Sequence, residues 1–191
     1  IKKAGINRIS LGVQSFNDEE CMILGRNHDS KQSIKALNII KSEIENFNID
    51  LIFSIPNSNI DLLDFSLKSA LSYKPKHISC YSLTIEPNTP FFKNKVQKSS
   101  DSEDKNQFTY LINNLKENNY FQYEISSFSK SGYECEHNKM YWDFDHYIGI
   151  GAGAHSLFNN QRFKKSSKIL DYIKYPLKKR INMLIGKRFN F

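Results

Sequence analysis

Apolar and polar residues alternate along three short segments of the chain, residues 8–13, 48–55 and 77–83. This period of two, combined with many Ile, Leu and Val residues, is typical of β-strands. The segments between them carry apolar residues at helical spacing, most clearly in 29–47 and 59–71. A helix between each pair of strands is the βαβ pattern, which predicts an α/β fold with a parallel sheet and right-handed crossovers.

Side chains that suit helix N-termini mark the expected helix starts. Asp29 with Gln32, and Ser100 with Glu103, have the spacing of a capping box, and Asn59 is a third candidate cap. We therefore expect helices to begin at these three places.

The alternation of strands and helices changes after Thr84. Two prolines stiffen residues 86–90, and residues 93–102 are polar and expected to be mobile. Residues 120–125 form the last predicted strand, and residues 126–156 are rich in aromatic residues, glycine and histidine. The last third of the chain therefore differs in character from the rest.

Composition and charge limit the function classes. The chain has 191 residues, of which 39% are hydrophobic, and a formal net charge of +7. The lysines are scattered along the expected helices and the C-terminal end, which is the pattern of a solvated surface, so we expect no specific nucleic-acid partner. No run of about 18 apolar residues occurs, so we expect no transmembrane segment.

The cysteine count indicates the redox environment. Cys21, Cys80 and Cys135 are an odd number of cysteines that lie far apart in the sequence. Such a set does not indicate a disulfide framework, and it fits a reducing compartment.

Gln14, Arg26 and Asp50 are polar side chains within or just after apolar segments. Ligands of parallel α/β folds lie at the carboxyl ends of the strands, where Gln14 is expected. Asp50 comes early in its strand and must point inward to take part. A purely structural alternative is an internal ion pair between Arg26 and Asp50 that ties the sheet together.

A second group of candidates lies in residues 133–142, which include His137, Tyr141 and Trp142. An imidazole beside flat apolar side chains could ligate haem iron, and Cys135 is a second candidate ligand. The structural alternative is that His137 caps a turn while the aromatic residues fill a core.

The third candidate segment, residues 147–156, contains Gly149, Gly151 and Gly153. It lacks the Gly-Lys-Ser/Thr sequence of a Walker phosphate loop, and no strand and helix evidently flank it. Small residues allow close backbone approach, either to a cofactor or to a neighbouring strand.

Four motifs together resemble one family. They are residues 12–16 (Gly-Val-Gln-Ser-Phe), 24–28 (Leu-Gly-Arg-Asn-His), 48–56 and 137–142 (His-Asn-Lys-Met-Tyr-Trp). The series resembles the second half of the radical S-adenosylmethionine (SAM) domain in the oxygen-independent coproporphyrinogen III oxidase-like family. The resemblance spans about residues 5–156 and is greatest to the HemW-type haem chaperone branch, which has the second and fourth of these motifs.

The resemblance implies residues that bind each cofactor. Gln14, Arg26 and Asp50 match motif positions that contact SAM in the family, and Thr84 falls where a weaker SAM contact lies. These side chains suit SAM, because a guanidinium binds its carboxylate and a carboxylate accepts hydrogen bonds from its ribose hydroxyls or ammonium. For haem, the implied ligand is His137.

The resemblance also implies what lies outside the sequence. The family holds a [4Fe-4S] cluster on a Cys-x3-Cys-x2-Cys loop, which three widely spaced cysteines cannot form. We therefore expect the chain, which starts at Ile1, to be the C-terminal part of a longer protein that supplies the cluster ligands. Residues 1–125 would be the second half of a partial (β/α) barrel, and residues 126–191 the start of a small α+β region with a divergent basic tail after Phe158.

Three functions are open at this point, and no catalytic residue is assigned. The first is a haem chaperone or haem-trafficking protein, with haem or porphyrin, SAM and haem-receiving proteins as partners. The second is an oxygen-independent coproporphyrinogen III dehydrogenase of porphyrin biosynthesis, and the third is an inactive truncated product. The expected location is the cytoplasm, or an organelle stroma or matrix if a transit peptide precedes this segment.

Overall fold

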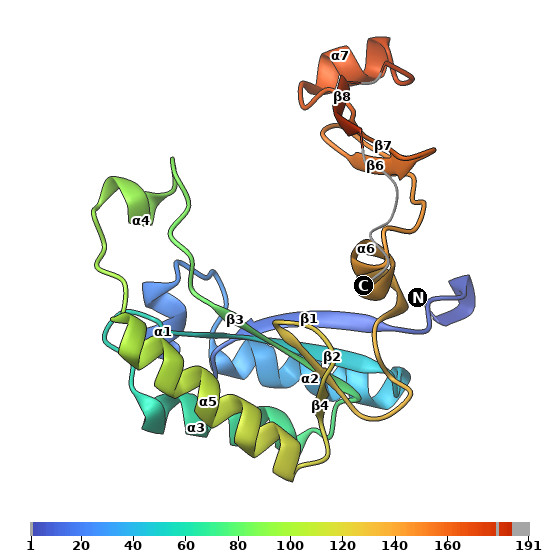
Figure 1. Ribbon diagram of the computed structural model, residues 1–191. Helices are drawn as coiled ribbons and strands as arrows, with labels where there is room; N and C mark the ends of the chain where they lie inside the picture. Colours follow the sequence, from blue (N-terminus) through green and yellow to red (C-terminus); the bar gives the residue numbers. More distant parts are fainter. Residues whose placement is uncertain (1, 179, 185–191) are drawn as a thin grey trace. The chain divides into compact units, whose positions relative to one another are not determined.

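The computed structural model describes residues 2–178 and 180–184. Its chain divides into two compact units, Ile1–Glu134 and Cys135–Phe191. The division falls shortly after residue 125, where the sequence indicated a change of character. Each unit has its own sheet (Figure 1).

The first unit is built on a mixed five-stranded sheet with the order β1-β2-β3-β5-β4. Its strands are β1 (Ile9–Gln14), β2 (Phe47–Phe53), β3 (His77–Ser82), β4 (Phe121–Gln122) and β5 (Ser127–Ser129). The pairs β1–β2 and β2–β3 are parallel, as the βαβ pattern predicts. In contrast, β5 is antiparallel to both β3 and β4.

The end of this sheet differs from the sequence prediction. One strand was expected over residues 120–125, whereas the chain forms β4, turns, and returns as β5. Only Phe128 of β5 contributes to the hydrophobic core, and serines flank it on both sides. A strand of three residues with one apolar side chain is too short to show a period of two.

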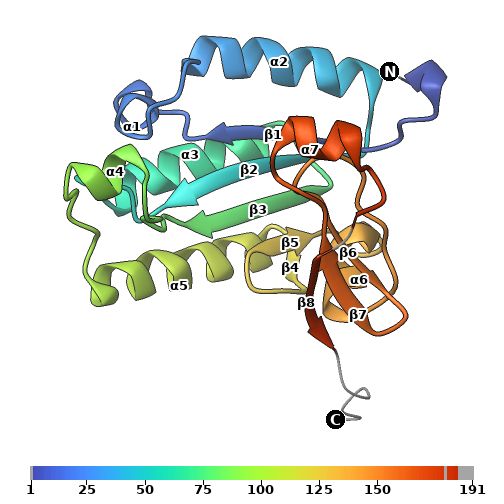
Figure 2. The same ribbon diagram turned by 90° about the horizontal axis from the view of Figure 1, so that it is seen from above.

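Three long helices cover one face of this sheet (Figures 1 and 2). They are α2 (Ser30–Glu43), α3 (Ile60–Ser72) and α5 (Asp101–Glu117); the shorter elements are η1 (Lys2–Ala4), α1 (Asp18–Ile23) and α4 (Pro90–Lys93). All three predicted caps are confirmed. Asp29 and Ser100 form complete capping boxes, and the Asn59 side chain accepts from the backbone N–H of Leu62.

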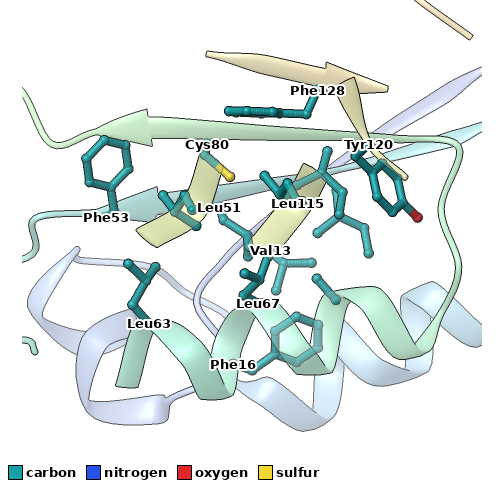
Figure 3. Close-up of a cluster of buried hydrophobic side chains, with 14 of the residues drawn as sticks. Val13, Phe16, Leu51, Phe53, Leu63, Leu67, Cys80, Leu115, Tyr120 and Phe128 are labelled. Carbon is teal, nitrogen blue, oxygen red and sulfur yellow. The ribbon is translucent and has the colours of Figure 1, made fainter. Parts of the chain in front are cut away.

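The hydrophobic core lies between these helices and the sheet, as Figure 3 shows. Val13, Leu51 and Cys80 point into it from the three parallel strands, and Leu67 and Leu115 meet them from α3 and α5. Burying a leucine side chain stabilises the folded state by about 1.5–3 kcal/mol. Because neighbouring strand residues point to opposite faces, the residues between these core positions must lie on the other face of the sheet.

The second unit combines short helices with a three-stranded antiparallel sheet. Its elements are α6 (Glu136–Trp142), β6 (His155–Phe158), β7 (Gln161–Lys164), α7 (Ile169–Lys174) and β8 (Arg180–Leu184). Asn159 and Asn160 join β6 to β7, and their φ angles of 49° and 59° are those of a tight hairpin turn.

The position of β1 predicts the solution behaviour of the chain. Among the described residues, β1 pairs with β2 alone and lies at the edge of the sheet. An edge strand presents unpaired backbone N–H and C=O groups to other chains. We therefore expect the 191-residue chain to associate, with a mass from light scattering that rises with concentration. A monomer that stays monomeric as the concentration rises would contradict this expectation.

Candidate functional site

The face of the first sheet that points away from the core is lined by polar side chains. Ser10, Asn48, Asp50, His77 and Ser79 alternate with core residues along β1, β2 and β3. The strand register places Asn48 between Ser10 and His77, and places Asp50 beside Ser79. Strands of parallel sheets are usually apolar on both faces, because helices cover both. The polar face is therefore the candidate ligand surface of this unit.

Asp50 lies within this face, half-buried, and its two carboxylate oxygens are held by different donors. Ser10 Oγ donates to Asp50 Oδ2 over 3.0 Å, and Asn48 Nδ2 donates to Asp50 Oδ1 over 2.7 Å. Each carboxylate oxygen can accept a further hydrogen bond. Asp50 thus points to the face where a ligand could reach it, although it lies in the middle of its strand.

Gln14 ends β1 with a φ angle of 71°, in the left-handed region. Its side chain folds back over Gly12: a Cβ atom at residue 12 would lie 2.5 Å from Gln14 Nε2. Since Gly12 pairs with Asp50 in the register, the amide of Gln14 lies on the same face as the carboxylate. A glycine is required two residues before Gln14, and the motif at residues 12–16 provides it.

The loop that follows Gln14 is anchored by a buried polar cluster. Ser15 and Ser58 each donate a side-chain hydrogen bond to the carboxylate of Glu20, which is 4% exposed. Ser66 Oγ lies 3.1 Å from Ser15 Oγ. These contacts join the start of α1 to α3 and to the loop before it, so the end of β1 is held in place.

Arg26 follows α1 and is exposed to solvent. Its backbone N–H donates to the carbonyl of Cys21 after Gly25, whose φ angle is 65°. Within the described part of the chain, no ion pair joins Arg26 to Asp50, so the structural alternative raised by the sequence is absent. The guanidinium is exposed to ligands from solvent.

Thr84 and the motif residue His28 have local contacts. Thr84 is exposed two residues after β3, with its Oγ1 3.5 Å from the carbonyl oxygen of Ser82. His28 Nε2 lies 3.2 Å from the carbonyl oxygen of Val13, so this histidine joins the loop after α1 to the end of β1. This contact gives His28 a structural role.

His77 connects the polar face to the chain between β4 and β5. Its ring is fully buried, with Nδ1 2.6 Å from Asn48 Oδ1 and Nε2 2.7 Å from the hydroxyl of Tyr123. Burial, together with the nearby positive charge of Arg8, lowers the pKa of His77 to about 3. The imidazole is therefore neutral at neutral pH. No sequence motif singled out His77 or Asn48 as a site residue, although polar residues at every second strand position could have indicated them.

The cysteines do not form a metal site. Cys21, Cys80 and Cys135 are buried and lie in α1, in β3 and at the start of α6. Burial raises the pKa of both Cys21 and Cys80, which disfavours the thiolate that iron requires. In the part of the chain that the structure covers, no group of three or more His, Cys, Asp or Glu side chains could hold a metal ion. These residues do not fit an iron–sulfur cluster.

In the second unit, His137 lies exposed on α6. Its Nε2 is 3.1 Å from the hydroxyl of Tyr141, and the two rings meet edge to face at 4.9 Å. Cys135, not His137, is the N-cap of this helix. Trp142 is 57% exposed. The alternative in which His137 caps a turn over an aromatic core is therefore not what the structure has.

Packing explains the first glycine of the glycine-rich segment. A Cβ atom on Gly149 would lie 2.1 Å from the carbonyl oxygen of His155, which no side chain tolerates. The N–H of Gly149 donates to Ser156 Oγ over 2.9 Å. The segment thus lies tightly along the start of β6.

Comparisons with known proteins show which superfamily the chain resembles. Residues 1–68 match the model of the radical SAM superfamily. The heme chaperone HemW of Buchnera aphidicola subsp. Schizaphis graminum is 39% identical over an alignment 194 residues long, which includes 97% of this chain and 51% of that protein. HemW of Escherichia coli is 38% identical over 170 residues, with 87% and 45% covered. The chain thus spans about half the length of the curated relatives it matches.

A solved structure shows the same fold. Coproporphyrinogen III oxidase (HemN) from Escherichia coli, described as a radical SAM enzyme, superposes with a TM-score of 0.76 at 20% sequence identity. The match covers 91% of this chain and 44% of that one. These findings show that the chain belongs to the radical SAM superfamily. Within it, the chain is a homologue of the HemW haem chaperones over about half of their length.

Among the described residues, no helix has both the length and the apolar character needed to cross a bilayer. The alignment with HemW of Buchnera aphidicola subsp. Schizaphis graminum covers 97% of the chain, so the similarity extends past Phe158, after which a divergent tail was expected.

The low pKa of His77 predicts a pH-dependent stability. In the unfolded chain His77 binds a proton near pH 6.5, whereas the folded state does so only near pH 3, so the free energy of unfolding falls as the pH decreases between these values. The expected loss between pH 7 and pH 5 is about 2 kcal/mol. Urea unfolding at both pH values measures it. The variant His77→Asn should lose this difference; an equal loss in wild type and His77→Asn would contradict the assignment.

Proposed function

We propose that the chain is part of a radical SAM haem chaperone, and that its first unit forms the SAM-binding half of a partial (β/α) barrel. The observation that carries this proposal is the polar face of the parallel sheet, where Gln14 lies on the same face as a firmly held Asp50 carboxylate. Both residues lie in the part of the chain that matches the radical SAM superfamily.

The chemistry of these side chains fits SAM. The exposed guanidinium of Arg26 would donate two parallel hydrogen bonds to the methionine carboxylate. Asp50 would accept from the ribose hydroxyls or the ammonium, and the amide of Gln14 can donate and accept. Thr84 would add a weaker contact from the end of β3. A [4Fe-4S] cluster beside SAM would supply the one electron that splits SAM into methionine and a 5′-deoxyadenosyl radical, which is the chemistry of this superfamily.

The cluster itself must be held by residues other than those described here. All three cysteines are buried, and among the described residues no group of three or more His, Cys, Asp or Glu side chains could hold a metal ion. The proposal therefore assigns the cluster ligands to another part of the protein, and assigns only SAM contacts to this chain.

The second unit carries the features that support haem binding. Large apolar side chains that follow His137 are exposed over a short stretch, namely Tyr141, Trp142, Phe144, Ile148 and Ile150. A haem needs apolar surface for its faces, and an imidazole is one of the side chains that ligate its iron. We therefore assign His137 as the haem ligand, which requires its Nε2 to exchange the hydrogen bond with Tyr141 for iron.

The SAM assignment predicts the effect of two substitutions in the full-length protein with its cluster. Arg26→Ala should weaken SAM binding by about 1.5–3 kcal/mol, because a hydrogen bond to a charged group is lost. Arg26→Lys should recover little, since lysine lacks the planar fork. Titration calorimetry with SAM measures both, with Lys35→Ala on the exposed side of α2 as the control. Wild-type affinity in both Arg26 variants would refute the assignment.

The haem assignment predicts opposite effects of neighbouring substitutions. His137→Ala should shift the Soret band of the haem-loaded full-length protein and lower its haem affinity. Tyr141→Phe should raise the affinity, because it keeps the ring and removes the hydrogen bond to Nε2. Haem titration measures each, with exposed His155→Ala as the control.

Two results would contradict the haem proposal. Haem affinity that is the same in His137→Ala and wild type would place the ligand elsewhere. Anaerobic turnover of coproporphyrinogen III by a protein that binds no haem would make the chain part of an oxidase.

A further inference from the structure

We propose that a directed series of hydrogen bonds, from Tyr123 through His77 and Asn48, fixes the orientation of the Asp50 carboxylate. Tyr123, His77 and Asn48 are then positioning residues for the ligand face, although none of them needs to touch the ligand. This inference rests on the SAM-binding role proposed for Asp50.

The direction of the series follows from the chemistry of its last member. A carboxylate only accepts, so the group that Asn48 places 2.7 Å from Asp50 Oδ1 must be its NH₂. The same NH₂ lies 2.6 Å from Ser10 Oγ. The Ser10 hydroxyl donates its own hydrogen to Asp50 Oδ2, so Ser10 Oγ must accept from Asn48. The amide orientation of Asn48 is therefore determined, and its Oδ1 must face His77.

The remaining links follow in turn. Asn48 Oδ1 accepts from His77 Nδ1 over 2.6 Å and from Ser79 Oγ over 3.2 Å. A neutral imidazole has one N–H, so His77 must carry its proton on Nδ1. His77 Nε2 is then an acceptor, and the hydroxyl of Tyr123 donates to it over 2.7 Å. Every link has one donor and one acceptor.

Because the series is buried, a change at Tyr123 can alter the groups that contact Asp50. His77 and Asn48 are at most 1% exposed, and buried hydrogen bonds are stronger and more costly to leave unmade than exposed ones. Without the Tyr123 hydroxyl, His77 Nε2 would lose its donor, and Asn48 Oδ1 would be the one remaining group of the series that holds the His77 proton on Nδ1. With the proton on Nε2, Asn48 would be free to turn its oxygen toward Asp50, and two acceptors would then face each other.

The test uses the full-length protein with its cluster, SAM as the probe and titration calorimetry as the first readout. Tyr123→Phe should weaken SAM binding roughly 3- to 10-fold, the scale of one neutral hydrogen bond. Asn48→Asp replaces the donor beside Asp50 by an acceptor, so the loss at neutral pH should be at least about tenfold. The control is Tyr110→Phe, which removes a hydroxyl bonded to Asp64 over 2.6 Å in the helical layer. It should leave SAM affinity unchanged.

A second readout separates positioning from a general loss of structure. Nitrogen-15 NMR of the imidazole should show His77 with its proton on Nδ1 in the wild type, and a mixture of tautomers in Tyr123→Phe. A His77 that carries its proton on Nε2 in the wild type would overturn the series. So would a Tyr123→Phe variant that keeps the Nδ1 proton while losing SAM affinity.

Asp50→Asn distinguishes this inference from the function on which it rests. If Asp50→Asn binds SAM as well as the wild type does, the proposed SAM site is wrong. If Asp50→Asn binds SAM weakly but Tyr123→Phe and Asn48→Asp bind it normally, the SAM site stands and the positioning series is wrong.

Discussion

The two-sided character of β2 is the constraint on which both the core and the ligand face depend. Ile49 and Leu51 enter the core, and Asn48 and Asp50 enter the polar face. A shift of one residue in the register would turn both polar side chains into the core and both apolar ones onto the polar face. The hydrophobic energy that stabilises the sheet therefore also fixes where the Asp50 carboxylate points.

The two faces of the whole sheet differ in the same way as the two faces of β2. On the helical side, apolar packing and helix caps supply stability (Figure 3). On the other side, hydrogen bonds orient polar side chains, from the buried Asn48 and His77 to the half-buried Asp50. At the carboxyl end of β1, the absence of a side chain on Gly12 leaves the space into which the Gln14 side chain folds, so Gln14 joins the polar face. A site for a polar ligand needs this combination, because its side chains must be both polar and rigidly held.

The features that could be predicted from the sequence are those with local signals. The capping boxes at Asp29 and Ser100 need only the spacing of two residues, and the structure has both. The parallel order of the first three strands follows from the helices between them. The short strand β5 has no such signal, because its one core residue, Phe128, depends on partners supplied by β3 and β4.

The candidate site could be predicted in part for the same reason. Gln14, Arg26 and Asp50 belong to contiguous motifs. Asn48 and His77 become visible only when the strands are paired, because they lie 29 residues apart in the sequence and 2.6 Å apart across the sheet. The register that joins them is a property of the whole sheet, which no single motif encodes.

The most direct test of the account is a structure of the full-length protein with its cluster and bound SAM. The account predicts SAM on the face that carries Ser10, Asn48 and Asp50, with an Asp50 oxygen within about 3 Å of a hydroxyl or the ammonium of SAM. It also predicts the guanidinium of Arg26 at the SAM carboxylate. SAM bound on the helical side of the sheet, or on this face without a contact to Asp50, would contradict the central claim.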